Sequence, residues 1–191
     1  MRGVRGSAVA FCALGALLAS GCGGGGERQD EDEPKGNFRV ELVEASFPAQ
    51  QKLAEKVALK LRVRNADSKA IPNMAVTVDG FSARSEQAGL ADPTRPVWVI
   101  DEPPRGGVTA YTNTWALGKV AAGQTEEFVW EVTPVKPGRY EVKYRVSAGL
   151  DGRAKAVAEG GKGTSGSFTV NVSREADDAR VDPDSGAVVR E

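Results

Sequence analysis

Apolar and charged residues alternate along much of the chain from residue 38 onward. In KVALKLRVR (56–64), apolar residues alternate with Lys or Arg from residue 59 on, and Val57 is in phase with them. Three further segments repeat this pattern: FVWEV (128–132), RYEVKYRVSA (139–148) and SFTVNV (167–172). A period of two with one charged face is typical of half-buried antiparallel strands. In FRVELVEASF (38–47) the alternation slips between Leu42 and Val43, which predicts a β-bulge.

Turn-forming residues lie between these segments and set the number of strands. LAEKVALKL (53–61) also has apolar residues at helical spacing, but its alternation continues to Val63 and stops at Asn65, so we predict a strand from about residue 55. Further turns are expected at Asp79-Gly80, Ala122-Gly123 and Lys136-Pro137-Gly138. About seven short strands separated in this way predict an all-β fold, an antiparallel β-sandwich over residues 37–173.

Residues 1–21 have the features of an export signal. Arg2 and Arg5 precede an apolar run, Ala8–Leu18, which at 11 residues is shorter than the roughly 20 that span a membrane as a helix. The small residues Ala19-Ser20-Gly21 then meet Cys22. This arrangement resembles the lipobox of bacterial lipoproteins, with Ala19 where leucine is more common. The resemblance implies that Cys22 is acylated and anchors the protein at the extracytoplasmic face of a cell membrane. The alternative is an ordinary cleaved signal with an incidental cysteine.

Residues 22–36 are expected to form a tether between the lipid and the folded domain. Gly23–Gly26 have no side chains to bury, and Asp30-Glu31-Asp32-Glu33 is a block of like charges that favours solvation. As a flexible coil, residues 23–36 would span on the order of 20 Å. The acidic block could also be imagined as a calcium site, but we interpret it as a solvated spacer.

The composition excludes several classes of function. The formal net charge is −1, so nothing indicates a nucleic-acid partner. The chain has no histidine, the commonest general base and a frequent zinc or copper ligand, and only two methionines. We therefore expect neither a metal nor another cofactor. If Cys12 leaves with the signal and Cys22 carries lipid, no disulfide can form, and we expect Trp115, Trp130 and two tyrosines, Tyr140 and Tyr144, to anchor the core.

Two longer stretches resemble a known kind of domain. Gly138-Arg139-Tyr140-Glu141-Val142 looks like the tyrosine corner of immunoglobulin (Ig)-like domains, with Val142 in place of a disulfide cysteine. VALKLRVRNADSKAIPNMAVTVDGF (57–81) and WALGKVAAGQTEEFVWEVTPVKPGRYEVKYRV (115–146) are similar to CARDB-type (cell-adhesion-related) and other Ig-like envelope domains. The resemblance implies an Ig-like β-sandwich that serves as a spacer, adhesion module or binding module, and it carries no catalytic residues.

The long connection at residues 82–108 is where binding residues are expected, because long loops on a rigid sandwich often carry function. It contains Arg95, Trp98, Ile100 and Asp101, an aromatic and aliphatic cluster flanked by charges. We take these four as the candidate patch for a partner or ligand, since Trp and Arg are favoured at interfaces. The alternative is that Val97–Ile100 is an extra strand with Trp98 folded onto the core.

Two other segments are assigned from composition. Gly149–Gly166 is rich in glycine and is expected to be a mobile hairpin loop, since it lacks the residue order of a phosphate-binding loop. Residues 174–191 are expected to be a loosely ordered tail, in which Ala187-Val188-Val189 could add an edge strand.

Three hypotheses for function follow. The first is a non-catalytic module that docks an envelope protein through the 82–108 insertion or an exposed sheet edge. The second is a lipoprotein that binds a sugar, peptide or lipid near Trp98. The third is a hydrolase that uses carboxylates such as Asp92, Asp101 or Glu102. We favour the first and keep the second as the alternative. The third has the least support, because the sequence does not fix the separation of any two carboxylates.

Overall fold

The structure is a computed structural model that describes residues 30, 33–81, 96–111, 113–160, 163–176, 179–185 and 188–190. The predicted export signal, Cys22 and residues 23–29 of the tether lie outside these residues. Within the described part the chain is built from strands, and no helix there is long and apolar enough to cross a membrane.

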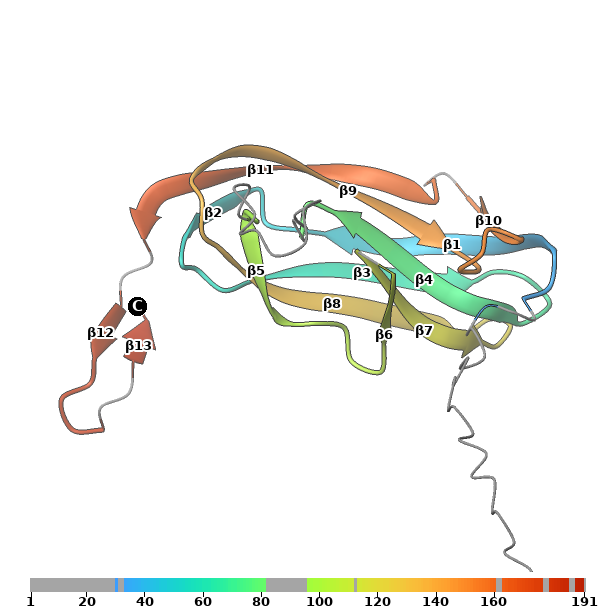
Figure 1. The fold of residues 1–191 in the computed structure, drawn as a ribbon, viewed down its shortest axis with the longest axis horizontal. Coiled ribbons are helices and arrows are strands. Elements are labelled where there is room, and N and C mark those ends of the chain that lie inside the picture. The colour runs from blue at the N-terminus through green and yellow to red at the C-terminus, as the bar shows by residue number, and fades with distance from the viewer. Residues whose placement is uncertain are drawn as a thin grey trace, which may run out of the picture.

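Eleven strands form two sheets packed face to face, and two more form a separate hairpin (Figure 1). The first sheet has the order β10-β1-β3-β8-β5 and the second the order β2-β11-β9-β4-β7-β6. The strands are β1 (Gly36–Ser46), β2 (Gln50–Leu53), β3 (Val57–Asn65), β4 (Ile71–Asp79), β5 (Trp98–Glu102), β6 (Val108–Tyr111), β7 (Thr114–Val120), β8 (Thr125–Pro134), β9 (Gly138–Ser147), β10 (Ala154–Ala158), β11 (Ser165–Ala176), β12 (Ala179–Val181) and β13 (Val188–Arg190).

The all-β sandwich predicted from the alternation is confirmed. The four segments with a period of two are β3, β8, β9 and β11, and in β3 the apolar residues are buried while most residues between them are exposed. The bulge predicted in the first strand is also present, because the register of β1 on β3 shifts between Leu42 and Glu44. The helical alternative for 53–61 is excluded, since a turn at Ala54, which has a φ of 60°, separates β2 from β3.

The sandwich has more strands than the seven predicted, and two of its strand pairs are parallel. β10 runs parallel to β1 and β2 runs parallel to β11. The prediction of a mobile hairpin loop over 149–166 is therefore wrong for Ala154–Ala158, because this short segment hydrogen-bonds to the edge of β1. The predicted loose tail is also ordered in part, since β11 continues to Ala176 and β12 pairs with β13.

The core lies between the two sheets and is centred on aromatic side chains. Trp130 and Trp115 pack edge to face with ring centroids 5.4 Å apart, and both are buried, as is Tyr144. Tyr140 is partly buried against this core, and its hydroxyl donates a hydrogen bond of 3.0 Å to the carbonyl of Pro137. The expected tyrosine corner is thus present, and Val142 beside it is fully buried.

Asn65 joins the turns at one end of the sandwich. Its side-chain nitrogen lies 3.0 Å from the carbonyl oxygens of Lys69, Val120 and Ala121, and its side-chain oxygen accepts the backbone N–H of Asp67. Asn65 is completely buried and so is Val120, so the carbonyl of Val120 has no access to water as an alternative partner. Asn65, which ends β3, therefore fixes the turns after β3 and after β7 at this end of the sandwich.

The acidic block before β1 differs from the prediction of a solvated spacer. Asp30 and Glu33 have exposed fractions of only 3% and 6%. Gly36 is already the first residue of β1, where it pairs with Ala154. The tether predicted over 22–36 therefore overlaps the folded domain at its C-terminal end.

Candidate functional site

The structure places Trp98 in the core. Its side chain is 1% exposed and packs against the rings of Phe47, Phe81 and Tyr140. Its indole N–H donates a hydrogen bond of 2.8 Å to the buried side-chain oxygen of Gln51. An interface residue must reach the surface, so the interpretation of Trp98 as part of an exposed patch is wrong. The alternative, an extra strand with Trp98 folded onto the core, is what β5 shows.

The other members of the candidate patch do not surround Trp98 at the surface. Ile100 is partly buried against the core, as expected for a residue two positions along the same strand. Asp101 is exposed, and its carboxylate accepts a hydrogen bond of 2.6 Å from the hydroxyl of Thr133 on β8. Arg95 lies outside the described residues, and so does Asp92 of the hydrolase hypothesis. The described residues of the patch therefore divide between the core and the outer face of the sheet.

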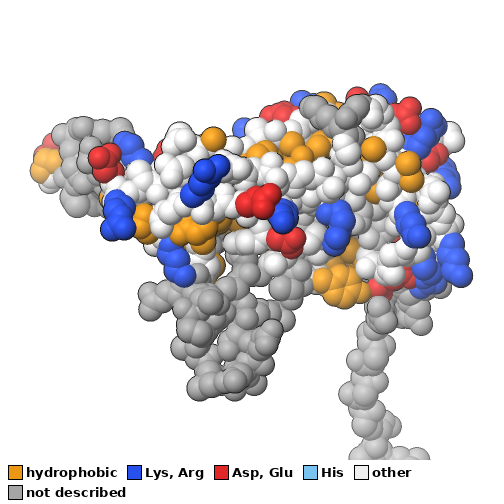
Figure 2. Space-filling model, turned by 90° about the horizontal axis from the view of Figure 1, so that it is seen from above, with side chains coloured by type: hydrophobic (Ala, Val, Ile, Leu, Met, Phe, Trp, Pro, Cys, Tyr) orange, Lys and Arg blue, Asp and Glu red, His pale blue; other side chains and the backbone are white. Residues whose placement is uncertain are grey.

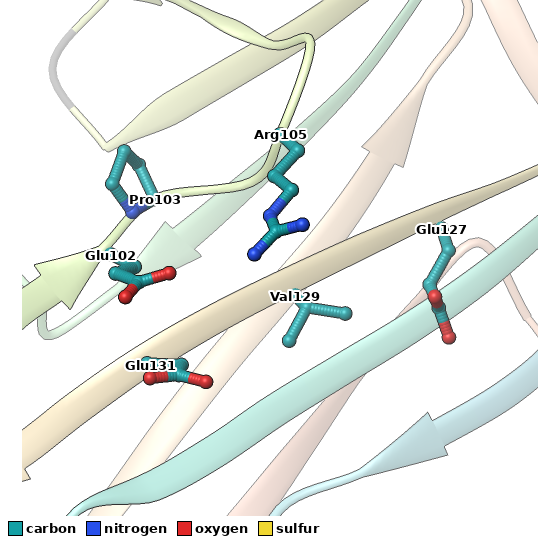
Figure 3. A pocket seen from close by; sticks show the side chains of 6 residues that line it. All are labelled: Glu102, Pro103, Arg105, Glu127, Val129 and Glu131. Atoms are coloured by element: carbon teal, nitrogen blue, oxygen red, sulfur yellow. The ribbon is translucent and has the colours of Figure 1, made fainter.

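A cavity of about 280 Å³ lies where β5 ends beside β8 (Figure 3). Glu102 closes β5, Pro103 and Arg105 belong to the connection that follows, and β8 contributes alternate residues from its outer face. The lining residues are Glu102, Pro103, Arg105, Glu127, Val129 and Glu131. The guanidinium group of Arg105 extends over β8 between the side chains of Glu102 and Glu127 in Figure 3.

The charges of this cavity favour binding over acid–base chemistry. Three carboxylates line the cavity with one guanidinium group, and Glu131 also forms an ion pair of 3.5 Å with Lys56, the residue before β3. A general acid and a general base need carboxyl groups in different environments, whereas Glu102 and Glu127 are both exposed to solvent. Among the residues that the structure describes, no group of three or more Asp, Glu, Cys or His side chains could hold a metal ion.

A second depression lies on the side of the sandwich where β1 and β11 approach each other. Its floor is apolar and its rim carries one charge of each sign; the lining residues are Glu44, Ala45, Ser46, Phe47, Pro48, Ala58, Lys60 and Phe168. Phe168 is only partly buried, although it packs against Phe47 at 6.0 Å between centroids. We call this depression the side groove. Figure 2 looks at the molecule from above the view of Figure 1, from the side on which β9 and β11 lie, and hydrophobic side chains reach that surface between charged ones.

The side groove adjoins two incompletely paired strands. β10 pairs with β1 only from Gly36 to Val40, and the N–H of Glu159 then donates to the carbonyl of Val40. β2 pairs with β11 only from Asn171 onward. Within the described residues, Glu44–Ser46 of β1 pair with β3 on one side, and the first half of β11 pairs with β9 on one side. The sequence pattern did not single out this surface, because it depends on where β10 and β2 stop.

Comparisons with known proteins give distant similarities. No protein-family profile and no curated protein matches the chain. Among solved structures, the chain is similar to the CARDB domain of a Pyrococcus furiosus protein in complex with di-metal ions, with 14% identity, 72% of this chain and 94% of that chain covered, and a TM-score of 0.42. It is also similar to PapD-like domain 7 of human CEP192, with 10% identity, 75% and 84% covered, and a TM-score of 0.39. A third similarity is to the β-glucosidase of Listeria innocua, with 16% identity, 73% of this chain but 16% of that chain covered, and a TM-score of 0.35. The first of these is the kind of domain that the sequence resembles.

Proposed function

We propose that this chain is a lipid-anchored envelope protein whose sandwich is a non-catalytic module that binds another envelope protein. The proposal for the anchor is supported by the basic start, the short apolar run and the small residues before Cys22. In a lipoprotein, Cys22 would carry the acyl chains and the sandwich would stand on the extracytoplasmic face of the membrane.

The side groove is the single observation that carries the proposal for a protein partner. The chain's own short segments β10 and β2 already extend the sheets at this side by parallel pairing. An extended segment of a partner that continued the line of β10 along β1 would meet the exposed part of Phe168 and the apolar floor beside it. Main-chain hydrogen bonds would provide affinity and apolar side chains at every second position would provide specificity. The partner segment is therefore expected to be an extended peptide with alternating apolar residues.

In-cell photocrosslinking tests this proposal. A photoreactive residue at Ser46, on the wall of the side groove, is compared with one at Lys143, on the outer face of β9. We expect a discrete crosslinked band for position 46 and none for position 143, and mass spectrometry of that band identifies the partner. Equal crosslinking at both positions, or none at position 46, would contradict docking at the side groove.

A second candidate function is small-ligand binding, favoured by the cavity after β5 rather than by Trp98. The cavity is near the lower end of the size range of ligand pockets and combines one guanidinium group with carboxylates, a set that suits a small polar ligand such as a sugar or a short peptide. Ligand-detected NMR with a library of sugars and dipeptides tests it. Signals that disappear with Arg105→Ala would support this function, whereas signals that are equal in both proteins, or missing, would count against it.

A further inference from the structure

The residues before β1 are attached to the turn that joins β9 to β10. Glu33 accepts hydrogen bonds through both carboxylate oxygens, from the backbone N–H of Leu150 at 2.7 Å and from that of Asp151 at 3.1 Å. A buried carboxylate that receives two backbone N–H groups has exchanged its water for fixed donors. The contact spans more than a hundred residues of sequence, so it belongs to the tertiary fold and not to a local turn.

Gly149 makes room for this contact. A Cβ atom built at Gly149 would lie 2.3 to 2.6 Å from the three carboxyl atoms of Glu33. Atoms at that separation overlap, so any larger residue at position 149 must displace the Glu33 side chain. The glycine thus has a steric role here, which separates it from the glycines of the same segment that only form turns.

Three further hydrogen bonds hold the same segment. The carboxylate of Asp30 accepts a bond of 2.7 Å from the hydroxyl of Tyr111 on β6, and its backbone carbonyl accepts one of 3.3 Å from Arg153. The N–H of Gly36 donates to the carbonyl of Arg153 at 3.1 Å. The segment is therefore fastened at its start, middle and end to elements of both sheets.

We propose that Asp30 and residues 33–36 form a rigid joint that fixes the direction in which the membrane tether leaves the sandwich. The inference rests on the proposed lipid anchor at Cys22. It shortens the spacer expected from the sequence from residues 23–36 to residues 23–29, which fully extended reach about 25 Å. A short spacer on a rigid joint presents one end of the sandwich to the membrane, whereas a long spacer on a free end would let the domain rotate.

The joint determines which end faces the lipid. The turns at 65–69 and 121–124 lie at the same end as Gly36, since Lys69 lies above the ring of Phe38 and Asn65 binds both turns. The loop at Ala49 lies at the opposite end, where its carbonyl accepts the N–H of Asn171. Figure 1 shows β12 and β13 beyond that second end, so the hairpin points away from the end that carries the joint. The side groove opens toward Phe47 and Pro48, near the end that would face away from the membrane.

Nitroxide labels on the lipidated protein in phospholipid vesicles test the joint. If processing removes Cys12 and acylates Cys22, Ala122→Cys or Ala49→Cys is the one free thiol, and both alanines are exposed. With a nickel-chelating lipid in the vesicles, we expect relaxation of the label at 122 to be several-fold faster than at 49. Gly149→Val should bring the ratio close to one. Gly163→Val is the matched control, because its added Cβ meets nothing closer than 3.5 Å, and it should keep the wild-type ratio.

Amide hydrogen exchange on the same samples tests the Glu33 contact without relying on the lipid anchor. It also shows whether each variant is folded. We expect exchange in 149–153, measured near about pH 4, to rise at least tenfold in Glu33→Ala, which removes the acceptor, while Glu41→Ala, at a half-exposed glutamate paired with Arg64, leaves it unchanged. A wild-type ratio near one with the protein bound to vesicles would overturn the joint, and so would unchanged exchange in Glu33→Ala. A protein that does not bind the vesicles would instead refute the anchor, and the exchange result would still decide whether the segment is held.

Discussion

Replacing Trp98 distinguishes a core residue from an interface residue. The indole is 1% exposed and contacts three aromatic rings, so Trp98→Ala removes a large apolar surface and leaves a cavity. Substitutions of this kind cost about 3–5 kcal/mol. The side-chain oxygen of Gln51 also loses its indole donor while it stays buried, which costs about 1–3 kcal/mol. We expect a total loss of about 5 kcal/mol in the free energy of unfolding, or roughly 15 °C in Tm.

Urea unfolding followed by circular dichroism measures this loss. Val99→Ala is the control, because Val99 is the next residue of β5 and is 46% exposed, and its change should stay within about 0.5 kcal/mol. Trp98→Phe keeps a ring in the core but removes the N–H donor, so its cost should lie between the two. If Trp98→Ala and Val99→Ala had the same unfolding midpoint, the assignment of Trp98 to the core would be refuted.

Three further predictions concern the core, the turns and pH. Trp130→Ala should lower the free energy of unfolding by about 3–5 kcal/mol, and an unchanged thermal midpoint would contradict its place in the core. Asn65→Ala should cost about 1–3 kcal/mol, because it leaves the buried carbonyl of Val120 without a donor. Urea unfolding measures this loss, and a value below about 0.5 kcal/mol would count against the prediction. The pKa of Glu33 is raised, first by burial and then by its hydrogen bond with Asp151. The stability that Glu33 gives to this contact is therefore complete below pH 4.5 and is lost as pH rises through the raised pKa. The pKa of Asp151 is lowered to about 2, first by its hydrogen bond with Glu33 and also by Arg153. The stability that Asp151 gives to this contact is therefore present above pH 3.8 and is lost as pH falls toward 2. Exchange protection of residues 149–153 should therefore peak near about pH 4, and Glu33→Gln should remove the decline at higher pH.

Local patterns predicted the strands that bury one face. The alternation in β3 and β9 follows directly from a sheet with one side on the core, and the slip after Leu42 located the bulge because a bulge shifts that alternation by one residue. The tyrosine corner was also predictable, since its hydrogen bond joins residues only three apart, Tyr140 and Pro137.

Pairings between distant segments were not predictable from these patterns. β10 is five residues long and follows a glycine-rich turn, and it becomes a strand because the edge of β1 is available to it. Trp98 looked like an interface residue because its neighbours in sequence are charged or aliphatic, whereas its partners Phe47 and Gln51 come from the link between β1 and β2 and from β2 itself.

The prediction for the acidic block was wrong in the opposite direction, because Asp30 and Glu33 were expected in solvent and are buried. Its like charges favour water when they are considered alone. One of them, Glu33, is bound in the fold because the glycine at position 149 leaves room for its carboxyl group. The side groove was not predicted for a related reason. Phe47 lies in the link after β1 and Phe168 fits the alternation of β11, so neither stands out in the sequence, and the surface forms where the two sheets end.

The most direct test of the account is the mass of the N-terminal peptide of the mature protein, isolated from the membrane fraction of its own cells. Both the membrane location and the joint depend on Cys22. The account predicts a peptide that begins at Cys22 and carries acyl chains, and a Cys22→Ser variant that leaves the membrane fraction. A mature protein that begins at another residue, or that retains an unmodified Cys22, would contradict the lipid anchor.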